Sequence, residues 1–70
     1  MIKLYTTKIC PKCIIVKKKL NEKGINFIEC MDFEEMTNLN IKSVPVMNIN
    51  YTLLNFNEII EYLNKLERTD

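Results

Sequence analysis

The sequence predicts a single α/β domain over residues 1–70, a four-stranded mixed β-sheet flanked by helices in the order β-α-β-α-β-β-α. Short β-compatible apolar runs alternate with stretches whose apolar residues recur at helical spacing, which predicts the mixture of elements. A helix-length stretch separates the first two strand-like runs, and parallel strands need a connection of this kind. The chain is also too short to supply a second core, so one fold must carry every function.

The first strand and the first helix have clear local signals. Leu4 and Tyr5 belong to a short apolar run that predicts a buried strand over residues 2–6. Pro11 suits the first position of a helix, because its φ is fixed near the helical value and its missing N–H would have no partner there. Gly24 is expected to end this helix in a left-handed conformation.

An apolar stripe runs along this predicted helix. Cys13, Val16 and Leu20 recur at i, i+3 and i+7. Ile14 and Ile15 are expected to widen the stripe, and the run of lysines that follows Val16 is expected to lie on the solvated side.

A second strand is predicted over residues 25–29, which alternate apolar and polar side chains around Phe27. Cys30 is expected to be partly buried at the end of this strand. Because the connection from the first strand is a crossover, the two strands are expected to be parallel. Asp32 is expected to cap a short helix over residues 33–39.

The second half of the sheet is a predicted hairpin. Residues 44–49 predict a third strand with Pro45 near its start, where proline marks an edge, a strand start or a cis bond. Asn50 and Tyr51 supply the turn, and residues 52–54 predict a fourth strand that pairs with the third.

The last helix has the clearest periodicity in the chain. Asn55 and Asn57 are its candidate N-caps, and Lys65 and Arg68 are expected near its negative C-terminal end. Its apolar residues fall at helical spacing and are Phe56, Ile59, Ile60, Leu63 and Leu66.

Composition and charge exclude several classes of function. The net charge of +1 gives no strong field to attract nucleic acid or an anionic membrane. No apolar stretch approaches the roughly 18 residues that span a bilayer, and residues 1–7 do not resemble a signal peptide. Histidine is absent, which excludes Cys-His catalysis and every zinc site that needs imidazole. We therefore expect a cytoplasmic monomer without a nucleic-acid or membrane partner.

Cys10 and Cys13 form a Cys-x-x-Cys pair between the first strand and the first helix, at the strand end where sites in α/β sheets tend to form. Thiol-disulfide exchange needs one thiolate that attacks and a second thiol that resolves the mixed disulfide. Cys10 is the predicted nucleophile, because unpaired helix N–H groups and the nearby Lys8 and Lys12 favour its thiolate. Cys13, one turn further in, is the predicted resolving thiol. Pro11 both starts the helix and stiffens the ring that a disulfide would close.

A second interpretation of the cysteine pair stays open. The same tetrapeptide is common in zinc ribbons, where a second Cys-x-x-Cys completes the tetrahedral site. This chain has no second pair, so Cys30 and a carboxylate would have to complete a zinc or iron–sulfur site. The stretch after Cys13 also predicts a long helix, whereas a ribbon needs a hairpin there.

Two motifs together resemble those of the glutaredoxin and thioredoxin superfamily. They are Tyr5-Thr6-Thr7-Lys8-Ile9-Cys10-Pro11-Lys12-Cys13 after the first strand and Ser43-Val44-Pro45-Val46 before the third. The resemblance covers nearly the whole chain in the right order and implies a thioredoxin fold in a minimal, glutaredoxin-like form. Ile9 and Pro11 stand where thioredoxins usually have tryptophan and glycine, so glutaredoxin is the closer relative.

The resemblance also implies a function. It implies a thiol-disulfide oxidoreductase without a bound cofactor, which reduces protein or glutathione mixed disulfides through the Cys-Pro-Lys-Cys dithiol. In the family, the proline that matches Pro45 is cis, and the residue that matches Val44 pairs its backbone with the substrate or with glutathione. The implied partners are a disulfide-bearing protein, with ribonucleotide reductase as one candidate, and either glutathione or a flavoprotein reductase as the reductant.

The start of the last helix departs from the glutaredoxin pattern. Glutaredoxins commonly carry Gly-Gly and an acidic residue there, where the glutathione carboxylate binds, but this chain has Leu54-Asn55-Phe56-Asn57-Glu58. Helix amides and the Asn57 side chain are expected to receive a carboxylate instead. The residues expected to bind the substrate or glutathione are Lys8, Pro11, Lys12, Val44, Pro45 and Asn57.

Overall fold

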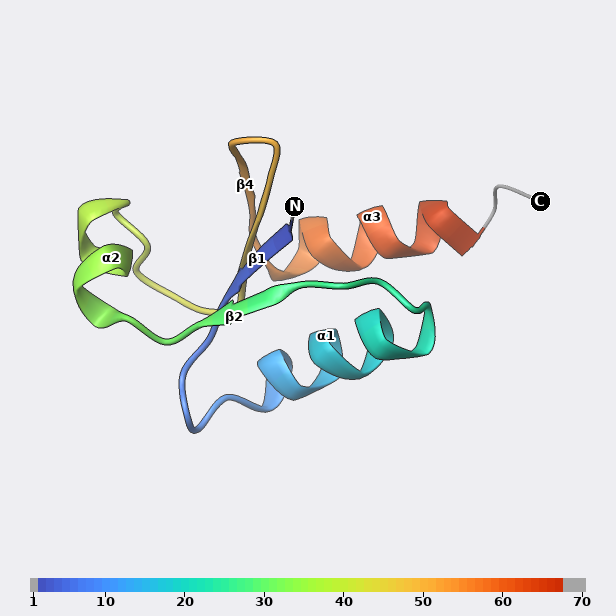
Figure 1. The fold of residues 1–70 in the computed structure, drawn as a ribbon, viewed down its shortest axis with the longest axis horizontal. Coiled ribbons are helices and arrows are strands. Elements are labelled where there is room, and N and C mark those ends of the chain that lie inside the picture. Colours follow the sequence, from blue (N-terminus) through green and yellow to red (C-terminus); the bar gives the residue numbers. More distant parts are fainter. Residues whose placement is uncertain (1, 68–70) are drawn as a thin grey trace.

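Seven elements follow one another in the predicted order in the computed structural model, which describes residues 2–67 (Figure 1). They are β1 (Ile2–Tyr5), α1 (Pro11–Glu22), β2 (Ile28–Cys30), α2 (Phe33–Asn38), β3 (Val46–Ile49), β4 (Thr52–Leu54) and α3 (Phe56–Glu67). The prediction for Arg68 falls outside the described residues.

The sheet is mixed, as predicted, with the strand order β2-β1-β3-β4. β1 pairs in parallel with β2, so that Leu4 lies opposite Glu29, and it pairs antiparallel with β3, so that Leu4 lies opposite Met47. β3 and β4 form the predicted antiparallel hairpin. The carboxyl end of β1 therefore lies in the middle of the sheet, and the chain leaves it directly toward the cysteine pair.

The helices cover the two faces of the sheet unequally. Figure 1 shows α1 and α3 on one side of the strands and α2 on the other. The main core lies under α1 and α3, and its fully buried side chains are Leu4, Val16, Leu20, Met47, Ile59 and Leu63. α2 contributes the buried Met36 on the opposite face. Between residues 2 and 67, no helix has the length and apolarity to cross a membrane.

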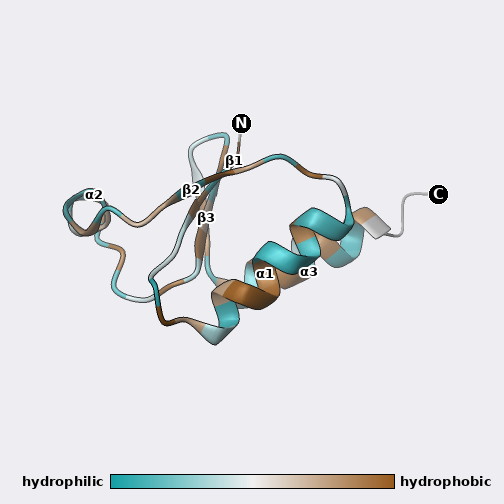
Figure 2. Cartoon of the chain, turned by 60° about the horizontal axis from the view of Figure 1, so that its bottom comes forward, coloured by the Kyte–Doolittle hydropathy of each residue, from teal (hydrophilic) through white to brown (hydrophobic). Residues whose placement is uncertain are grey.

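The apolar stripe of α1 is narrower than predicted. Cys13, Val16 and Leu20 are buried as expected, but the side chains of Ile14 and Ile15 are 62% and 45% exposed. The prediction that they widen the stripe is wrong, because each residue turns an α-helix by about 100°, which carries both side chains away from the sheet. In Figure 2, α1 is mostly hydrophobic in its N-terminal half, which includes these two isoleucines, and mostly hydrophilic in its C-terminal half.

Two strands begin later than predicted. β2 starts at Ile28, because Gly24 adopts the expected left-handed φ of 67° and the next N–H, that of Ile25, bonds back to the Leu20 carbonyl of α1. β3 starts at Val46, because its antiparallel partner β1 ends at Tyr5.

The turns behave as predicted. Asn50 and Tyr51 both have positive φ, 49° and 68°, which fits the two-residue turns that join antiparallel strands. Tyr51 is fully exposed at the tip of this hairpin. Asp32 caps α2, because its carboxylate accepts hydrogen bonds from the N–H groups of Glu34 and Glu35.

Candidate functional site

The two cysteines of the Cys-x-x-Cys pair lie at the N-terminus of α1. Cys10 is the N-cap residue, and Cys13 lies in the first helical turn behind Pro11. Their sulfurs form a disulfide, and their Cα atoms are 5.2 Å apart. This Cα–Cα distance lies within the usual range for disulfides. The extended backbone of Cys10 turns its side chain back over the helix, where its Sγ accepts a hydrogen bond of 3.1 Å from the Cys13 N–H.

The two sulfurs have different surroundings. Cys10 is 8% exposed and follows the almost fully exposed Ile9, whereas Cys13 is 1% exposed and belongs to the buried stripe of α1. The N–H that points at the Cys10 sulfur lies at the positive end of the helix dipole, so it would stabilise a thiolate there. Both cysteines are largely buried in the disulfide form, and Cys10 is the more accessible of the two.

The loop before β3 lies beside this cysteine pair. The Val44–Pro45 peptide bond is cis, as the resemblance implied, and Pro45 is buried. Because Tyr5 pairs with Val46, the residues just before β3 lie beside the residues that leave β1 toward Cys10. Among residues 2–67, the backbone of Val44 makes no hydrogen bond with other backbone groups, so it is open to an added strand.

Lysines at the site take up different positions. Lys8 is exposed on the loop before Cys10, and Lys12 is exposed on the first turn of α1. The Nζ of Lys12 lies 5.2 Å from the centroid of the Phe56 ring, close enough for a cation–π contact. Since Phe56 is the first residue of α3, this contact brings the N-termini of α1 and α3 side by side.

The first turn of α3 is capped by its own side chains. The Asn55 side-chain oxygen accepts a hydrogen bond from the Glu58 N–H, and the Glu58 carboxylate accepts one from the Asn55 N–H, both at 2.9 Å. Such a reciprocal pair is a capping box, which assigns the N-cap to Asn55. Asn57, the other N-cap candidate, is the second residue of α3 and does not cap it, and its side chain is exposed.

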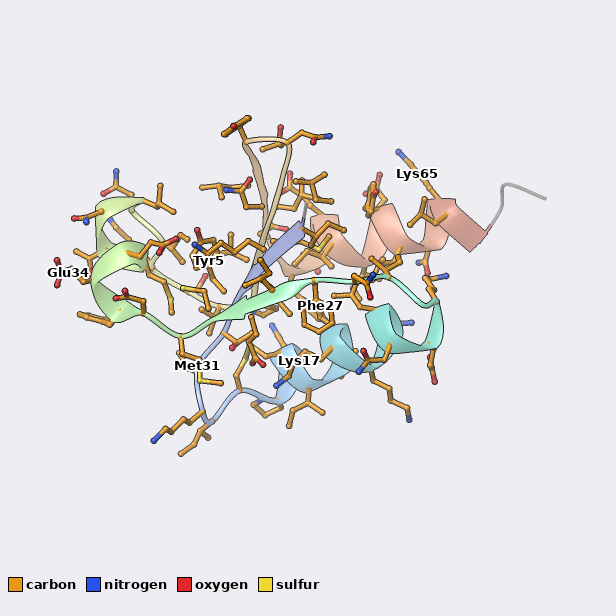
Figure 3. The ribbon with its side chains drawn as sticks, in the orientation of Figure 1. Tyr5, Lys17, Phe27, Met31, Glu34 and Lys65 are labelled. Atoms are coloured by element: carbon orange, nitrogen blue, oxygen red, sulfur yellow. A yellow bond between two sulfur atoms is a disulfide. The ribbon has the colours of Figure 1, made fainter. Side chains whose placement is uncertain are left out.

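Sequence reasoning missed a partly buried polar contact between α1 and the sheet. Thr6, which is fully buried, donates its hydroxyl proton to the Glu29 carboxylate at 2.6 Å, and Lys17 of α1 reaches the same oxygen at 3.0 Å. Figure 3 shows Lys17 between α1 and β2, so this lysine does not lie on the solvated side as predicted. The Thr6 hydrogen bond, helped by Lys17, holds the pKa of Glu29 below its ordinary value.

A similar contact lies on the α2 face of the sheet. The Glu35 carboxylate accepts hydrogen bonds from the Lys3 ammonium and, at 2.7 Å, from the Tyr5 hydroxyl. These bonds lower the pKa of Glu35, chiefly through Lys3, while burial raises the pKa of Tyr5. Cys30 is half-buried at the end of β2, as predicted, and the register places it beside Tyr5 on this face.

The placement of the three cysteines on the two faces of the sheet argues against the metal-binding interpretation. Cys30 belongs to the α2 face, whereas Cys13 lies under α1 on the other face, so the sheet separates the third sulfur from the pair. In the part of the chain that the structure describes, no three side chains of the types Cys, His, Asp or Glu are gathered as a metal site requires.

No protein-family model matches the chain. Comparisons with curated proteins and with solved structures did find similar proteins. A curated relative from Clostridium pasteurianum, described as an uncharacterized glutaredoxin-like 8.6 kDa protein in the rubredoxin operon, is 38% identical over 61 residues. The match covers 77% of this chain and 81% of the relative. The crystal structure of a point mutant of a thioredoxin-like protein matches with a TM-score of 0.73 at 24% identity, covering 96% of this chain and 99% of that one. This structural likeness confirms the predicted thioredoxin fold.

Proposed function

Since this chain belongs to the glutaredoxin-like proteins of the thioredoxin superfamily, we propose that it reduces disulfides in other proteins through Cys10 and Cys13. The observation that carries the proposal is the placement of Cys10 at a helix N-terminus, with a backbone N–H on its sulfur and its partner sulfur buried behind it. Helix N-termini lower the pKa of cysteine and so supply the reactive thiolate near neutral pH.

The reaction takes two displacement steps. The Cys10 thiolate attacks one sulfur of the substrate disulfide, which forms a mixed disulfide and releases the other substrate sulfur as a thiolate. Cys13 then loses its proton and attacks the Cys10 sulfur, which closes the Cys10–Cys13 disulfide and releases the second substrate thiolate. Two electrons pass from the dithiol to the substrate, and the two released thiolates take up protons, one given up by Cys13 and one from water. A reductant, glutathione or a flavoprotein reductase, must then restore the dithiol.

The surroundings of the pair support a protein or peptide substrate. The unpaired backbone of Val44 offers hydrogen bonds to an extended segment, and such a strand would hold its disulfide beside Cys10. The exposed Lys8 and Lys12 would attract acidic groups near the target disulfide, and Pro45 would shape the wall of the site. Ribonucleotide reductase is one candidate substrate, and the proposed setting is a cytoplasmic monomer with no bound cofactor.

Three cysteine variants test the proposal. We expect Cys10→Ser to abolish the reduction of insulin disulfides, and Cys13→Ser to accumulate a mixed disulfide with the substrate, because the resolving step is blocked. Cys30→Ser serves as the matched control and should keep full activity, since its side chain lies on the other face of the sheet. Equal residual turnover in the Cys10 and Cys13 variants would contradict the assigned roles.

A second measurement separates this proposal from the metal-binding alternative. The reduced protein should be free of zinc and iron, and the alkylation rate of Cys10 should follow a pKa below the value of about 8.5 for free cysteine. A stoichiometric metal that protects both cysteines from alkylation would favour the binding domain instead.

A further inference from the structure

Lys12 lies in the first turn of α1, between the two cysteines of the redox pair. The N-terminus of a helix is the positive end of its dipole, so a cation is disfavoured there. The first turn of α1 holds no acidic residue, and within residues 2–67 no carboxylate forms an ion pair with Lys12. Its ammonium instead lies 5.2 Å from the centroid of the Phe56 ring. The cation–π contact with this ring therefore decides where the ammonium lies.

The Phe56 ring is held in place independently of Lys12. Phe56 is the first residue of α3, and the capping box of Asn55 and Glu58 defines this helix start. The Phe56 side chain is partly buried and packs against the core. Lys12, in contrast, is exposed and has a flexible four-carbon stem. A movable ammonium thus lies on a fixed aromatic ring.

A second partner for this ammonium arises when the pair is reduced. In the disulfide the Cys10 sulfur carries no charge. Thiol reductants supply two electrons, the S–S bond breaks, Cys13 takes up a proton, and Cys10 remains a thiolate at the N-cap. Side chains of a helix lean toward its N-terminus, so the stem of Lys12 leans toward the end of α1 that carries Cys10. The thiolate and the Phe56 ring then compete for one ammonium.

From these contacts we propose that Phe56 is a positioning residue for the redox pair, which holds the Lys12 ammonium while the disulfide is closed and releases it to the Cys10 thiolate when the disulfide opens. The inference deepens the proposed function, because it concerns the same two sulfurs. The cation–π contact stabilises the oxidised protein, whereas the ion pair with the thiolate forms only when that contact is lost. Phe56 thereby shifts the equilibrium of the pair toward the disulfide, which makes the reduced protein a stronger reductant.

The test measures the ratio of reduced to oxidised protein at pH 7 in a redox buffer of 2-mercaptoethanol and its disulfide. Phe56→Leu removes the ring face but keeps an apolar side chain against the core. We expect this ratio to rise about threefold in the variant, as the loss of an exposed cation–π contact from the oxidised form alone predicts. The threefold change corresponds to a reduction potential that is higher by about 14 mV. The pKa of Cys10, followed by its alkylation rate, should fall in the same variant, because the ring no longer competes for Lys12.

Three further variants separate the action through Lys12 from a loss of packing. Phe56→Tyr keeps the ring face and should keep the wild-type ratio. Lys12→Met removes the ammonium, so adding Phe56→Leu to it should change neither the ratio nor the pKa of Cys10. Phe27→Leu is the matched control, because Phe27 is also partly buried against the core and, among residues 2–67, makes no cation–π contact. It should lower stability and leave the ratio unchanged.

Two results would overturn the inference. The first is an unchanged ratio in Phe56→Leu, and the second is an equal rise with and without the Lys12 ammonium. Insulin reduction separates the inference from the proposed function. If the wild type accelerates insulin reduction but Phe56→Leu leaves the ratio unchanged, only the inference about Phe56 is wrong. If the variants shift the ratio as expected but the wild type does not accelerate insulin reduction, the inference holds and the proposed function is wrong.

Discussion

The two faces of the sheet carry the same polar arrangement in different surroundings. On the α1 face, the Glu29 carboxylate accepts a buried hydroxyl proton from Thr6 and an ammonium proton from Lys17. On the α2 face, the Glu35 carboxylate accepts a hydroxyl proton from Tyr5 and an ammonium proton from Lys3. Each carboxylate thereby ties a helix to a neighbouring strand, α1 to β2 in one case and α2 to β1 in the other.

Apolar packing differs between the two faces much more than polar bonding does. The fully buried cluster of the core lies under α1 and α3, whereas α2 adds Met36, which is 5% exposed. The helix that carries the cysteine pair is therefore held by both kinds of contact, and α2 depends more on its polar bonds. This difference places the redox chemistry on the more firmly packed side of the molecule.

The largest effect expected from this comparison concerns core truncation. Leu63→Ala should lower the free energy of unfolding by about 3–4 kcal/mol, because it opens a cavity in the densely packed face. Met36→Ala should cost about 2 kcal/mol, at the low end for such changes, because the thinner α2 layer can close around the gap. Urea unfolding of both variants measures the difference. A larger loss for Met36→Ala would reverse the ranking of the two faces.

A smaller and nearly equal effect is expected from the two hydroxyl groups. Thr6→Val and Tyr5→Phe each remove one hydroxyl that donates to a carboxylate and leave the shape of the side chain almost unchanged. Each should lower the free energy of unfolding by about 1 kcal/mol, since water can reach the partly exposed carboxylates and replace part of the bond. If the two losses differ by more than twofold in urea titrations, the two arrangements are not equivalent.

The smallest effect is a dependence of stability on pH. The folded protein lowers the pKa of Glu29 and of Glu35 below the ordinary value of 4.5. A lowered folded pKa gives stability that is fully present above the unfolded pKa and is lost as pH falls through the folded pKa. The unfolding midpoint in urea should therefore not change from pH 7 to about 5 through these groups and should fall below about pH 4.5. Replacing both residues by glutamine should flatten that fall, and an unaltered acid profile would contradict the assignment.

Local patterns in the sequence were sufficient to predict most of the fold and the position of the cysteine pair at the start of α1. Pro11 after Cys10, the stripe of Cys13 with its helical neighbours, and Gly24 each act within a few residues, so the sequence predicts the helix and its ends. The motif around Pro45 likewise predicted the cis bond correctly. Such features need no knowledge of distant partners.

What the sequence did not reveal depends on distant partners. Thr6 meets Glu29 across 23 positions and Tyr5 meets Glu35 across 30, and alternation along a strand tells only which face a side chain occupies. Many acidic residues were available, so no pattern selected these two. The cap of α3 was different, because the spacing of Asn55 and Glu58 has the form of a capping box and could have favoured Asn55 over the other candidate.

The turn between β3 and β4 has a practical consequence. β3 begins next to the Pro45 loop, so its other end and the Asn50–Tyr51 turn stand at the opposite end of the sheet from the cysteine pair (Figure 1). The fully exposed Tyr51 makes this tip suitable for a fluorescent label or an affinity handle. A reporter attached there would follow the tumbling and complex formation of the whole protein while leaving the sulfur chemistry undisturbed.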